Sequence, residues 1–210
     1  MMNVISDKVV SRLSQYRRLL SQLNQQEIKH VFSHRMAEEM GVTATQVRRD
    51  LMVLGFSGSP TKGYHVEDLR VKITQFLDGH ERQLACICGI GNLGRAVMGY
   101  FSGRGVSVDV CAAFDVDPAK VGRAIVGRRC YHIDELESVC KELKLSVGII
   151  STPADTAQSV AEKMIQADIK GILNFAPVVL KLPSDIYVQN MDVSLALETV
   201  AFFASQKRQS

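Results

Sequence analysis

The chain has 210 residues, a hydrophobic fraction of 46% and a formal net charge of +3. These values suit a globular protein with one large domain or two modest ones. No apolar run is long enough to cross a membrane, and the start MMNVISDKVV contains Asp7 and lacks the apolar core of a signal peptide. We therefore expect a cytoplasmic protein without a membrane partner.

The positive charge is unevenly distributed. Residues 1–80 carry 11 Lys or Arg against 8 Asp or Glu, a net of +3, whereas residues 81–210 carry 14 of each. A polyanionic partner is therefore favoured for the first part of the chain. The number of cysteines is odd, five, and no CxxC pair is present. Because Cys86, Cys88 and Cys111 lie in apolar runs, we interpret these three as small buried hydrophobes and expect no metal site.

Short helices dominate residues 6–80. The first has one apolar face, and Ser6 is expected to cap it; the face comprises Val9, Leu13, Tyr16, Leu20 and Leu23. A second helix is predicted over residues 33–40 and ends at Gly41. A third begins at Thr43, which with Gln46 forms a predicted capping box, and stops at Gly55.

The second and third helices have the spacing of a helix-turn-helix, with the third as recognition helix. Val47, Leu51 and Leu54 are expected to face the core. The turn-rich segment 55–64 is a candidate wing, and Tyr64, His65 and Val66 are expected to close a small β-ribbon. The predicted DNA contacts are Thr45, Gln46, Arg48 and Arg49 from the helix and Lys62, Gly63 and Tyr64 from the wing. An ordinary solvated helix face remains the alternative for the two arginines.

A fourth helix is predicted over about residues 67–77, with Leu69, Ile73 and Phe76 facing inward, and residues 78–81 form a linker. From Arg82 the pattern changes to short apolar runs that alternate with helical stretches. The predicted strands are 84–88, 108–114, 147–151 and 172–175. This alternation predicts an α/β fold with a doubly wound parallel sheet.

The strongest motif follows the first of these strands and opens a helix. It reads Gly89-Ile90-Gly91-Asn92-Leu93-Gly94, and Asp115 ends the next strand 21 residues later. Gly89 permits the turn, Gly91 lets the backbone approach a pyrophosphate, and Gly94 allows close helix packing. The Asp115 carboxylate is suited to a ribose diol and repels a 2′-phosphate. The motif therefore predicts NAD(H) rather than NADP(H).

Residues at other strand ends are candidates for the nicotinamide half, because ligands bind at the carboxyl ends of the strands. They are Thr152, Pro153, Asn174, Phe175 and Pro177, although the two prolines are also suited to shaping turns. A terminal helix over residues 194–205 is apolar on more than one face. It is expected to cover a partner subunit or, alternatively, its own sheet.

Taken together, the sequence resembles the Rex family of redox-sensing repressors over nearly its whole length. The motifs that carry the resemblance are RLSQYRRLL, TQVRRDL, GIGNLG, FDVDPAKVG, PADTAQ, DIKGILNFAPV and NMDVSLALETVAF. Two positions depart from the family pattern: the wing tip is Ser59-Pro60-Thr61-Lys62 instead of a basic, glycine-rich tip, and Ser14 stands where proline is common.

The resemblance implies a winged-helix domain over residues 1–80, a Rossmann domain over 81–192 and a swapped dimerisation helix over 193–210. It implies a homodimer that binds operator DNA, with NADH favouring release and NAD⁺ permitting binding. It also implies that Tyr100 and Asp192 sense the nicotinamide. Two rival functions are an NAD-dependent dehydrogenase and a CoA-binding protein. We expect no catalytic residues, because no substrate-sized domain follows and the histidines lie away from the strand ends.

Overall fold

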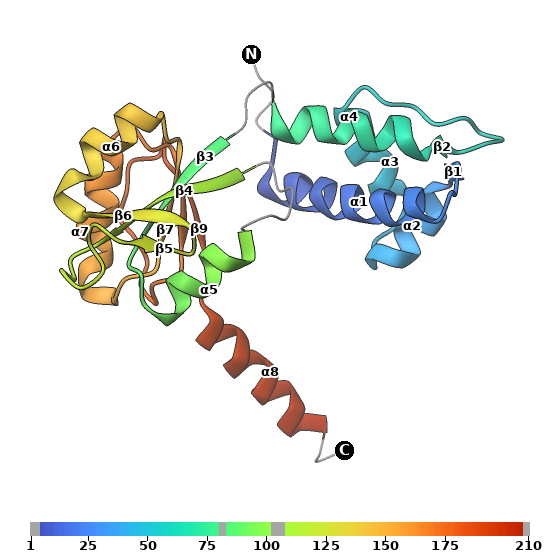
Figure 1. The fold of residues 1–210 in the computed structure, drawn as a ribbon. Coiled ribbons are helices and arrows are strands. Elements are labelled where there is room, and N and C mark those ends of the chain that lie inside the picture. The colour runs from blue at the N-terminus through green and yellow to red at the C-terminus, as the bar shows by residue number, and fades with distance from the viewer. Residues whose placement is uncertain (1–4, 80–82, 102–107, 208–210) are drawn as a thin grey trace. The chain divides into compact units, whose positions relative to one another are not determined.

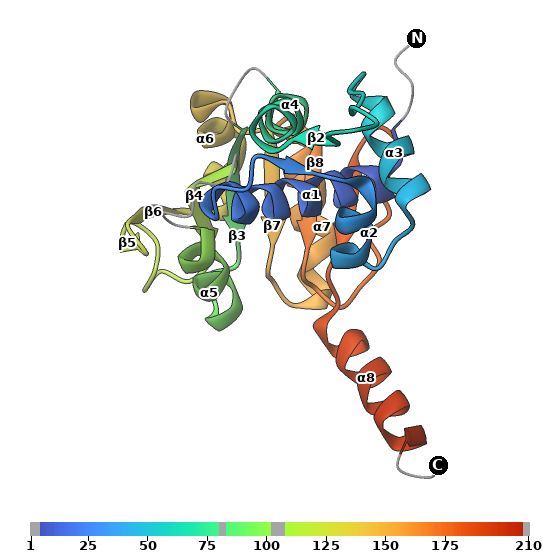
Figure 2. The same ribbon diagram turned by 90° about the vertical axis from the view of Figure 1, so that its right-hand side faces the viewer.

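The computed structural model describes residues 5–79, 83–101 and 108–207. The chain forms two compact units, Met1–Glu81 and Arg82–Ser210. Figures 1 and 2 show the elements of each unit. None of the described helices has the length and hydropathy needed to cross a membrane.

The first unit packs four helices around one core and adds a two-stranded ribbon. The helices are α1 (Asp7–Gln25), α2 (Ser33–Met40), α3 (Ala44–Val53) and α4 (Val66–Asp78), and the antiparallel strands are β1 (His30–Val31) and β2 (Tyr64–His65). The apolar face of α1 packs against α4. Tyr16 and Leu20 from α1 and Leu69 and Ile73 from α4 are fully buried in this core. This is the predicted winged helix-turn-helix.

Local signals set the turn between α2 and α3. Gly41 adopts a left-handed conformation with φ of 63°, which ends α2 without the strain of a Cβ. The Thr43 hydroxyl accepts the backbone N–H of Gln46 at 3.1 Å and caps α3. The other half of the predicted capping box is wrong, because the Gln46 side chain donates to Asp50 instead. Gly55, with φ of 63°, follows the end of α3.

Three further expectations for this unit need correction. Ser6 precedes α1 but its side chain makes no capping hydrogen bond. Val66 begins α4 rather than extending the ribbon, although its N–H still bonds across to the Lys29 carbonyl oxygen. Phe76 is 37% exposed although it follows Leu69 and Ile73 on one face of α4, and at this end of the helix Leu77 packs against the core instead.

The second unit is built on a seven-stranded sheet in the order β5-β6-β4-β3-β7-β8-β9. Six strands run parallel and the short edge strand β5 is antiparallel to β6. The strands are β3 (Gln83–Cys88), β4 (Val108–Asp115), β5 (Ala124–Ile125), β6 (Arg128–His132), β7 (Val147–Ile150), β8 (Gly171–Asn174) and β9 (Tyr187–Asn190). The order reverses at β3, which creates the crevice where nucleotides bind in such sheets.

Helices cover both faces of this sheet, as a doubly wound fold requires. The covering helices are α5 (Asn92–Phe101), a short 3-10 helix η1 (Ile133–Glu135), α6 (Leu136–Leu143) and α7 (Ala154–Gln166). The last helix of this unit, α8 (Val193–Lys207), has no buried residue and does not cover the sheet. One core gathers α6 and α7 against Cys86, Cys88 and Phe114. The other packs α5 against Ala85 and Ile87. The alternating side chains of β3 therefore serve two buried faces.

The five cysteines are free thiols, and four of them are buried within these cores. Cys111 is only partly buried, contrary to the expectation for that strand. The described residues contain no cluster of three or more His, Cys, Asp or Glu side chains suited to a metal ion. His132 ends β6 and caps η1, so the expectation that the histidines lie away from the strand ends is wrong for this residue.

The terminal helix α8 extends away from the sheet that precedes it (Figures 1 and 2). Its large apolar side chains are between 57% and 68% exposed; they are Val193, Leu195, Leu197, Val200, Phe202 and Phe203. The chain therefore does not cover this helix with its own sheet.

Candidate functional site

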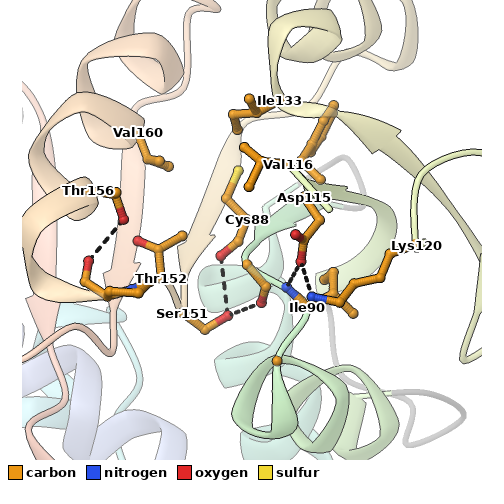
Figure 3. Close-up of a pocket in the computed structure, with 14 residues that line it drawn as sticks. Cys88, Ile90, Asp115, Val116, Lys120, Ile133, Ser151, Thr152, Thr156 and Val160 are labelled. Carbon is orange, nitrogen blue, oxygen red and sulfur yellow. Dashed lines mark hydrogen bonds and ion pairs between the residues drawn. The ribbon is translucent and has the colours of Figure 1, made fainter. Parts of the chain in front are cut away.

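The glycine turn between β3 and α5 has the close contacts that its sequence predicts (Figure 3). Gly89 has φ of +92°, and a Cβ there would lie 2.7 Å from the Ser151 carbonyl oxygen. A Cβ on Gly94 would collide with the Gly89 carbonyl oxygen, so α5 can approach the turn only with glycine at this position. The roles assigned to Gly89 and Gly94 are thus explained by contacts within the protein.

Gly91 differs from its two neighbours in the motif. A Cβ on Gly91 would meet no protein atom within 4 Å, and no positive φ constrains this residue. Gly91 instead lines a cavity of about 520 Å³. No contact within the described part of the chain requires glycine here, so the open space fits a ligand that approaches the backbone closely, as a pyrophosphate does.

Ser151, at the end of the neighbouring strand β7, supports the glycine turn. Its hydroxyl donates to the Gly89 carbonyl oxygen at 2.7 Å and lies 3.2 Å from the Cys88 carbonyl oxygen. Its backbone N–H also bonds to Cys88 at 2.9 Å. These contacts hold the turn against the sheet before any ligand arrives, which lowers the cost of ordering it on binding.

The cavity lies at the carboxyl ends of β3, β4 and β7 (Figure 3). Six of the predicted cofactor residues line it: Gly89, Ile90, Gly91, Asp115, Thr152 and Pro153. Apolar side chains contribute another wall, comprising Val116, Ile133 and Val160. An apolar slot beside a glycine turn and a carboxylate has the chemical character of an adenosine-binding pocket.

Asp115 holds a central position in this pocket. Its carboxylate accepts the Ile90 N–H at 2.7 Å, the Asp117 N–H at 3.0 Å and the Lys120 ammonium at 3.0 Å. Burial alone would raise the pKa of Asp115, but these three donors outweigh burial and hold its pKa below the ordinary value. Asp115 is therefore an anion at neutral pH, as an acceptor for ribose hydroxyls must be.

Asn92, Leu93 and Gly94 lie in the first turn of α5 and do not line the cavity. The N-terminus of this ten-residue helix follows the glycine turn directly, which places free N–H groups and partial positive charge beside the cavity. These residues thus build the anion-binding end of the helix, and Gly91 remains the residue with open space beside it.

Three of the five residues predicted for the nicotinamide half, Asn174, Phe175 and Pro177, do not line this cavity. Asn174 is fully buried, and its amide nitrogen donates to the carbonyl oxygens of Ala176 and Val178 and to the Asn190 side chain. It thus shapes the loop after β8. Phe175 is partly buried against the α5 core, and Pro177 is exposed in the same loop.

Tyr100 and Asp192 also lie away from the cavity lining. Tyr100, on α5, is 50% exposed and its ring contacts Phe101. The Asp192 carboxylate accepts the Leu195 N–H at 3.0 Å and caps α8. These contacts leave the proposed nicotinamide-sensing roles as predictions.

Sequence reasoning missed several residues of the pocket. Lys120 belongs to the FDVDPAKVG motif, but only the turn after β4 brings it back to Asp115. Ser151 was overlooked because small polar residues after a strand are common in turns, and Thr156 was overlooked because it lies in the first turn of α7. Thr152, in contrast, was expected here, and its buried hydroxyl has no hydrogen-bond partner among the residues that the structure describes.

The recognition helix of the first unit presents a mixed basic and polar face. Val47, Leu51 and Leu54 are buried as predicted, whereas Arg48 and Arg49 are exposed. The Arg48 guanidinium is held by two hydroxyl groups, donating to Ser33 at 3.1 Å and to Thr45 at 3.2 Å. The basic side chain is thus oriented before it meets a partner.

Asp50 anchors the inner side of this helix. Its side chain is 1% exposed and accepts four hydrogen bonds, two from Arg12, one from Tyr16 and one from Gln46. Burial alone would raise the pKa of Asp50, but Arg12, Gln46 and Tyr16 together hold it below the ordinary value. Gln46 is one of the predicted DNA contacts, but its side-chain amide donates a hydrogen bond to Asp50.

The candidate wing folds back on the ribbon. Ser59 and Gly63 exchange backbone hydrogen bonds of 2.8 Å, and Gly63 has φ of +72° close to the Val31 carbonyl oxygen. Lys62 is exposed at the tip, but Tyr64 is buried at 7% exposure. A groove of about 290 Å³ lies between the wing and Arg48, lined also by Phe32 and Ser33.

Comparisons with known proteins agree with both halves of this description. Residues 4–51 match the family described as putative DNA-binding protein N-terminus, and residues 80–178 match the family described as CoA binding domain. The redox-sensing transcriptional repressor Rex of Desulfitobacterium hafniense is 37% identical over 204 residues, covering 97% of each chain.

Solved structures give the same result. A Rex-family repressor called RSP, in complex with NAD⁺ and operator DNA, aligns with a TM-score of 0.91 at 33% identity and covers 99% of this chain and 95% of its own. The structure of RSP with NADH aligns with a TM-score of 0.85 at the same identity, covering 99% and 97%.

Proposed function

The chain belongs to the Rex family of redox-sensing transcriptional repressors, and we propose that it reads the ratio of NADH to NAD⁺ in the β3–β4–β7 pocket. The observation that carries the proposal is the joint placement of Gly91 and Asp115 in one cavity, within a chain that also holds a helix-turn-helix. The protein is a repressor rather than an enzyme. NADH and NAD⁺ act as ligands that differ in the shape and charge of the nicotinamide ring, and the protein does not convert one into the other.

Different residues of the pocket bind different parts of the dinucleotide. Gly89, Gly91 and the N-terminus of α5 hold the pyrophosphate, and Asp115 holds the adenine-side ribose. We propose that Thr152 and Pro153 face the nicotinamide half, because the buried Thr152 hydroxyl lacks a partner within the described residues. Asn174, Phe175 and Pro177 act through the shape of the loop after β8, and Tyr100 and Asp192 respond to the nicotinamide.

The first unit reads operator DNA through α3 and the wing. Arg48 and Arg49 are the proposed base-reading or phosphate-binding residues, helped by Thr45. Lys62 and Gly63 bring the wing to the backbone, and Gln46 and Tyr64 support the reading surface from inside. NADH releases the repressor and NAD⁺ permits binding, because the two cofactors differ in affinity for the DNA-binding arrangement.

We propose a homodimer whose terminal helix α8 inserts into the partner. The exposed apolar side chains of α8 support this arrangement, because an uncovered helix of this kind promotes aggregation. Two reading heads must be spaced by about one helical turn of DNA, roughly 34–36 Å, which a rotation of the dimer can disturb. A repressor works where the operator DNA lies, so we also propose a cytoplasmic location.

One observation favours a second ligand, namely the match of residues 80–178 to a CoA-binding family. CoA carries a phosphate on its ribose, whereas Asp115 and Asp117 place two carboxylates beside the pocket. Like charges at this distance oppose such a ligand. NAD(H) therefore fits the pocket better than CoA does.

A mobility-shift assay tests the proposal directly. Operator duplexes are first selected from a random library by the purified protein, and binding is then measured with NAD⁺, NADH or CoA added. We expect binding with NAD⁺ and release with NADH, at concentrations where CoA has no effect. Release by CoA alone, or no response to NADH, contradicts the proposal.

A further inference from the structure

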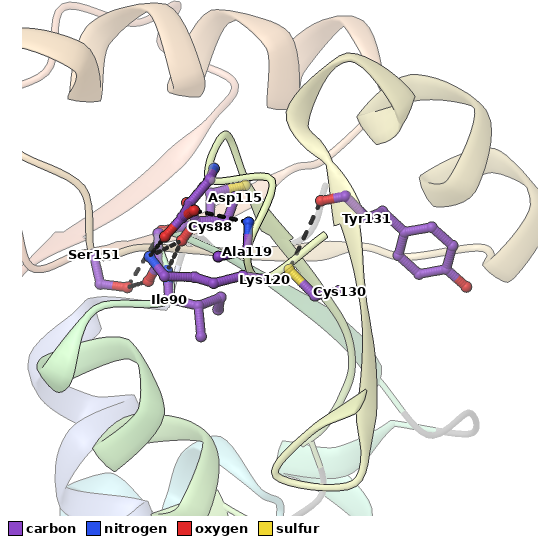
Figure 4. Close-up of polar contacts among 10 residues, drawn as sticks. Cys88, Ile90, Asp115, Ala119, Lys120, Cys130, Tyr131 and Ser151 are labelled. Carbon is purple, nitrogen blue, oxygen red and sulfur yellow. Dashed lines mark hydrogen bonds and ion pairs between the residues drawn. The ribbon is translucent and has the colours of Figure 1, made fainter. Parts of the chain in front are cut away.

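Asp115 and Lys120 lie beside the glycine turn (Figure 4), and with Asp117 they form a charged triad. The Lys120 ammonium donates to Asp115 at 3.0 Å and lies 3.4 Å from Asp117. The backbone joins the two carboxylates, since the Asp117 N–H donates to Asp115 at 3.0 Å. The Asp117 carboxylate also accepts the Ala119 N–H at 2.9 Å, so the turn after β4 is tied to the triad.

Asp115 has little acceptor capacity left for a ligand. A carboxylate offers about four lone-pair sites. Three of them are used by the donors from Ile90, Asp117 and Lys120. A ribose diol brings two hydroxyl donors, so Asp115 alone does not satisfy both while these contacts persist.

Lys120 has the complementary capacity. An ammonium group has three donors, and the Lys120 ammonium contacts the two carboxylates of the triad. The side chain is 22% exposed and lines the same cavity as Asp115. It is therefore placed to donate to a hydroxyl oxygen of the ribose that Asp115 binds.

The net charge of the triad favours a ribose with a free 2′-hydroxyl over a ribose with a 2′-phosphate. Two carboxylates and one ammonium leave one net negative charge beside the cavity. A bare lysine at this position would attract a 2′-phosphate, but Lys120 is already paired with both carboxylates. The pKa of Lys120 is raised by Asp115, so the ammonium stays charged over the physiological range.

From this geometry we infer that Lys120 binds the adenine-side ribose and that Asp117 restrains it, so that together they set the preference for NADH over NADPH. The inference rests on the proposed function, because it assumes that a dinucleotide occupies the pocket. It adds two residues to the recognition of that ligand and assigns the selectivity to a triad instead of to Asp115 alone.

The test is isothermal titration calorimetry, in which the full-length protein is titrated with NADH and, separately, with NADPH. The Lys120→Gln variant is expected to weaken NADH binding by roughly tenfold to a hundredfold, the usual size of a hydrogen bond to a charged group. Lys120→Arg keeps a charged donor and is expected to stay within about threefold of the unmodified protein. Lys141→Gln is the matched control, since Lys141 forms an exposed pair with Glu137 on α6.

Asp117→Asn separates selectivity from binding. It keeps the oxygen that accepts the Ala119 N–H but removes one negative charge. NADPH affinity is expected to rise by roughly threefold to tenfold, the size expected for one charge at a partly solvated site, while NADH affinity changes little. Asp168→Asn is the control, because Asp168 pairs with Lys170 on the surface.

The outcomes distinguish a failure of the proposed function from a failure of the role assigned to the triad. If the unmodified protein does not bind NADH, the proposed function fails and the triad role fails with it. If it binds NADH and Lys120→Gln binds NADH equally well, only the role of Lys120 is overturned. If Asp117→Asn leaves the ratio of NADH to NADPH affinity unchanged, the selectivity role is overturned. Thermal denaturation of each variant confirms that the affinities refer to folded protein.

Discussion

Arg12 and Asp50 form a two-pronged ion pair that ties α1 to the recognition helix, with Nε to Oδ2 at 2.6 Å and Nη2 to Oδ1 at 2.8 Å. Tyr16 and Gln46 complete the coordination of the same carboxylate. Because Asp50 is 1% exposed, this pair fixes the rotation of α3 about its axis and thereby the direction of Arg48 and Arg49.

The Asp50→Asn variant tests this relationship. Removing one partner of a buried ion pair leaves Arg12 uncompensated, and we expect the first unit to lose about 3 kcal/mol of stability. Operator binding should weaken as well, because α3 is no longer held in one orientation. Chemical denaturation and fluorescence anisotropy measure the two effects. The exposed Asp68→Asn change serves as control, and equal losses in both variants would contradict the account.

The same pair predicts a pH dependence. The pKa of Asp50 is lower in the folded state than its ordinary value of about 3.8. Its stabilisation is therefore complete above that value and is lost as the pH falls through the lower folded value. Stability measured from pH 6 downward should fall more steeply for the unmodified protein than for Asp50→Asn. Parallel curves would show that Asp50 is not ion-paired in solution.

Arg48 and Arg49 should contribute to operator binding in different ways. An arginine that reads a base edge should lose about 1–3 kcal/mol on replacement by alanine and relax specificity at one position. A phosphate-binding arginine should weaken all sequences alike and reduce the salt dependence. Binding-site selection with each variant tells these apart. Lys72→Ala on α4 is the control, and unchanged binding by the double arginine variant would remove α3 as the reading helix.

Gly91 and Gly94 should respond oppositely to alanine. The added methyl group at Gly91 meets no protein atom, so Gly91→Ala should fold normally and lose cofactor binding. At Gly94 the methyl group meets the Gly89 carbonyl, so Gly94→Ala should lose about 1–3 kcal/mol of stability. Thermal denaturation and NADH titration separate the two, with Gly171→Ala as control. A Gly91→Ala protein that binds NADH normally would show that the pyrophosphate lies elsewhere.

The terminal helix should control assembly. Removal of residues 193–210 takes away the exposed apolar side chains of α8. We expect a monomer that keeps NADH binding and loses tight operator binding, as measured by light scattering and anisotropy. The full-length double variant Leu197→Asp, Phe203→Asp should show the same loss of dimerisation and operator binding as the truncated protein. A truncated protein that remains dimeric and still releases DNA with NADH would contradict the swapped-helix arrangement.

The sequence predicted those features that local signals determine. The glycine turn, the Gly41 stop and the four long strands each depend on a few neighbouring residues, and all are present. Strand β5 was missed because it has only two residues, and β6 and β9 were missed because their sequences, RRCYH and YVQN, do not form an apolar run. Lys120 and the Gln46–Asp50 bond were missed because tertiary folding alone brings those side chains together. Asn174 looked like a ligand contact, yet its buried amide is used by the loop after β8.

The most direct test of the central claim uses a preformed complex of the protein with selected operator DNA, followed by fluorescence anisotropy as NADH is added. The account predicts that NADH releases the DNA from the unmodified protein, and that Gly91→Ala holds the same DNA with equal affinity but does not release it. Release of DNA from Gly91→Ala at the same NADH concentrations would show that the β3–β4–β7 pocket is not the sensor.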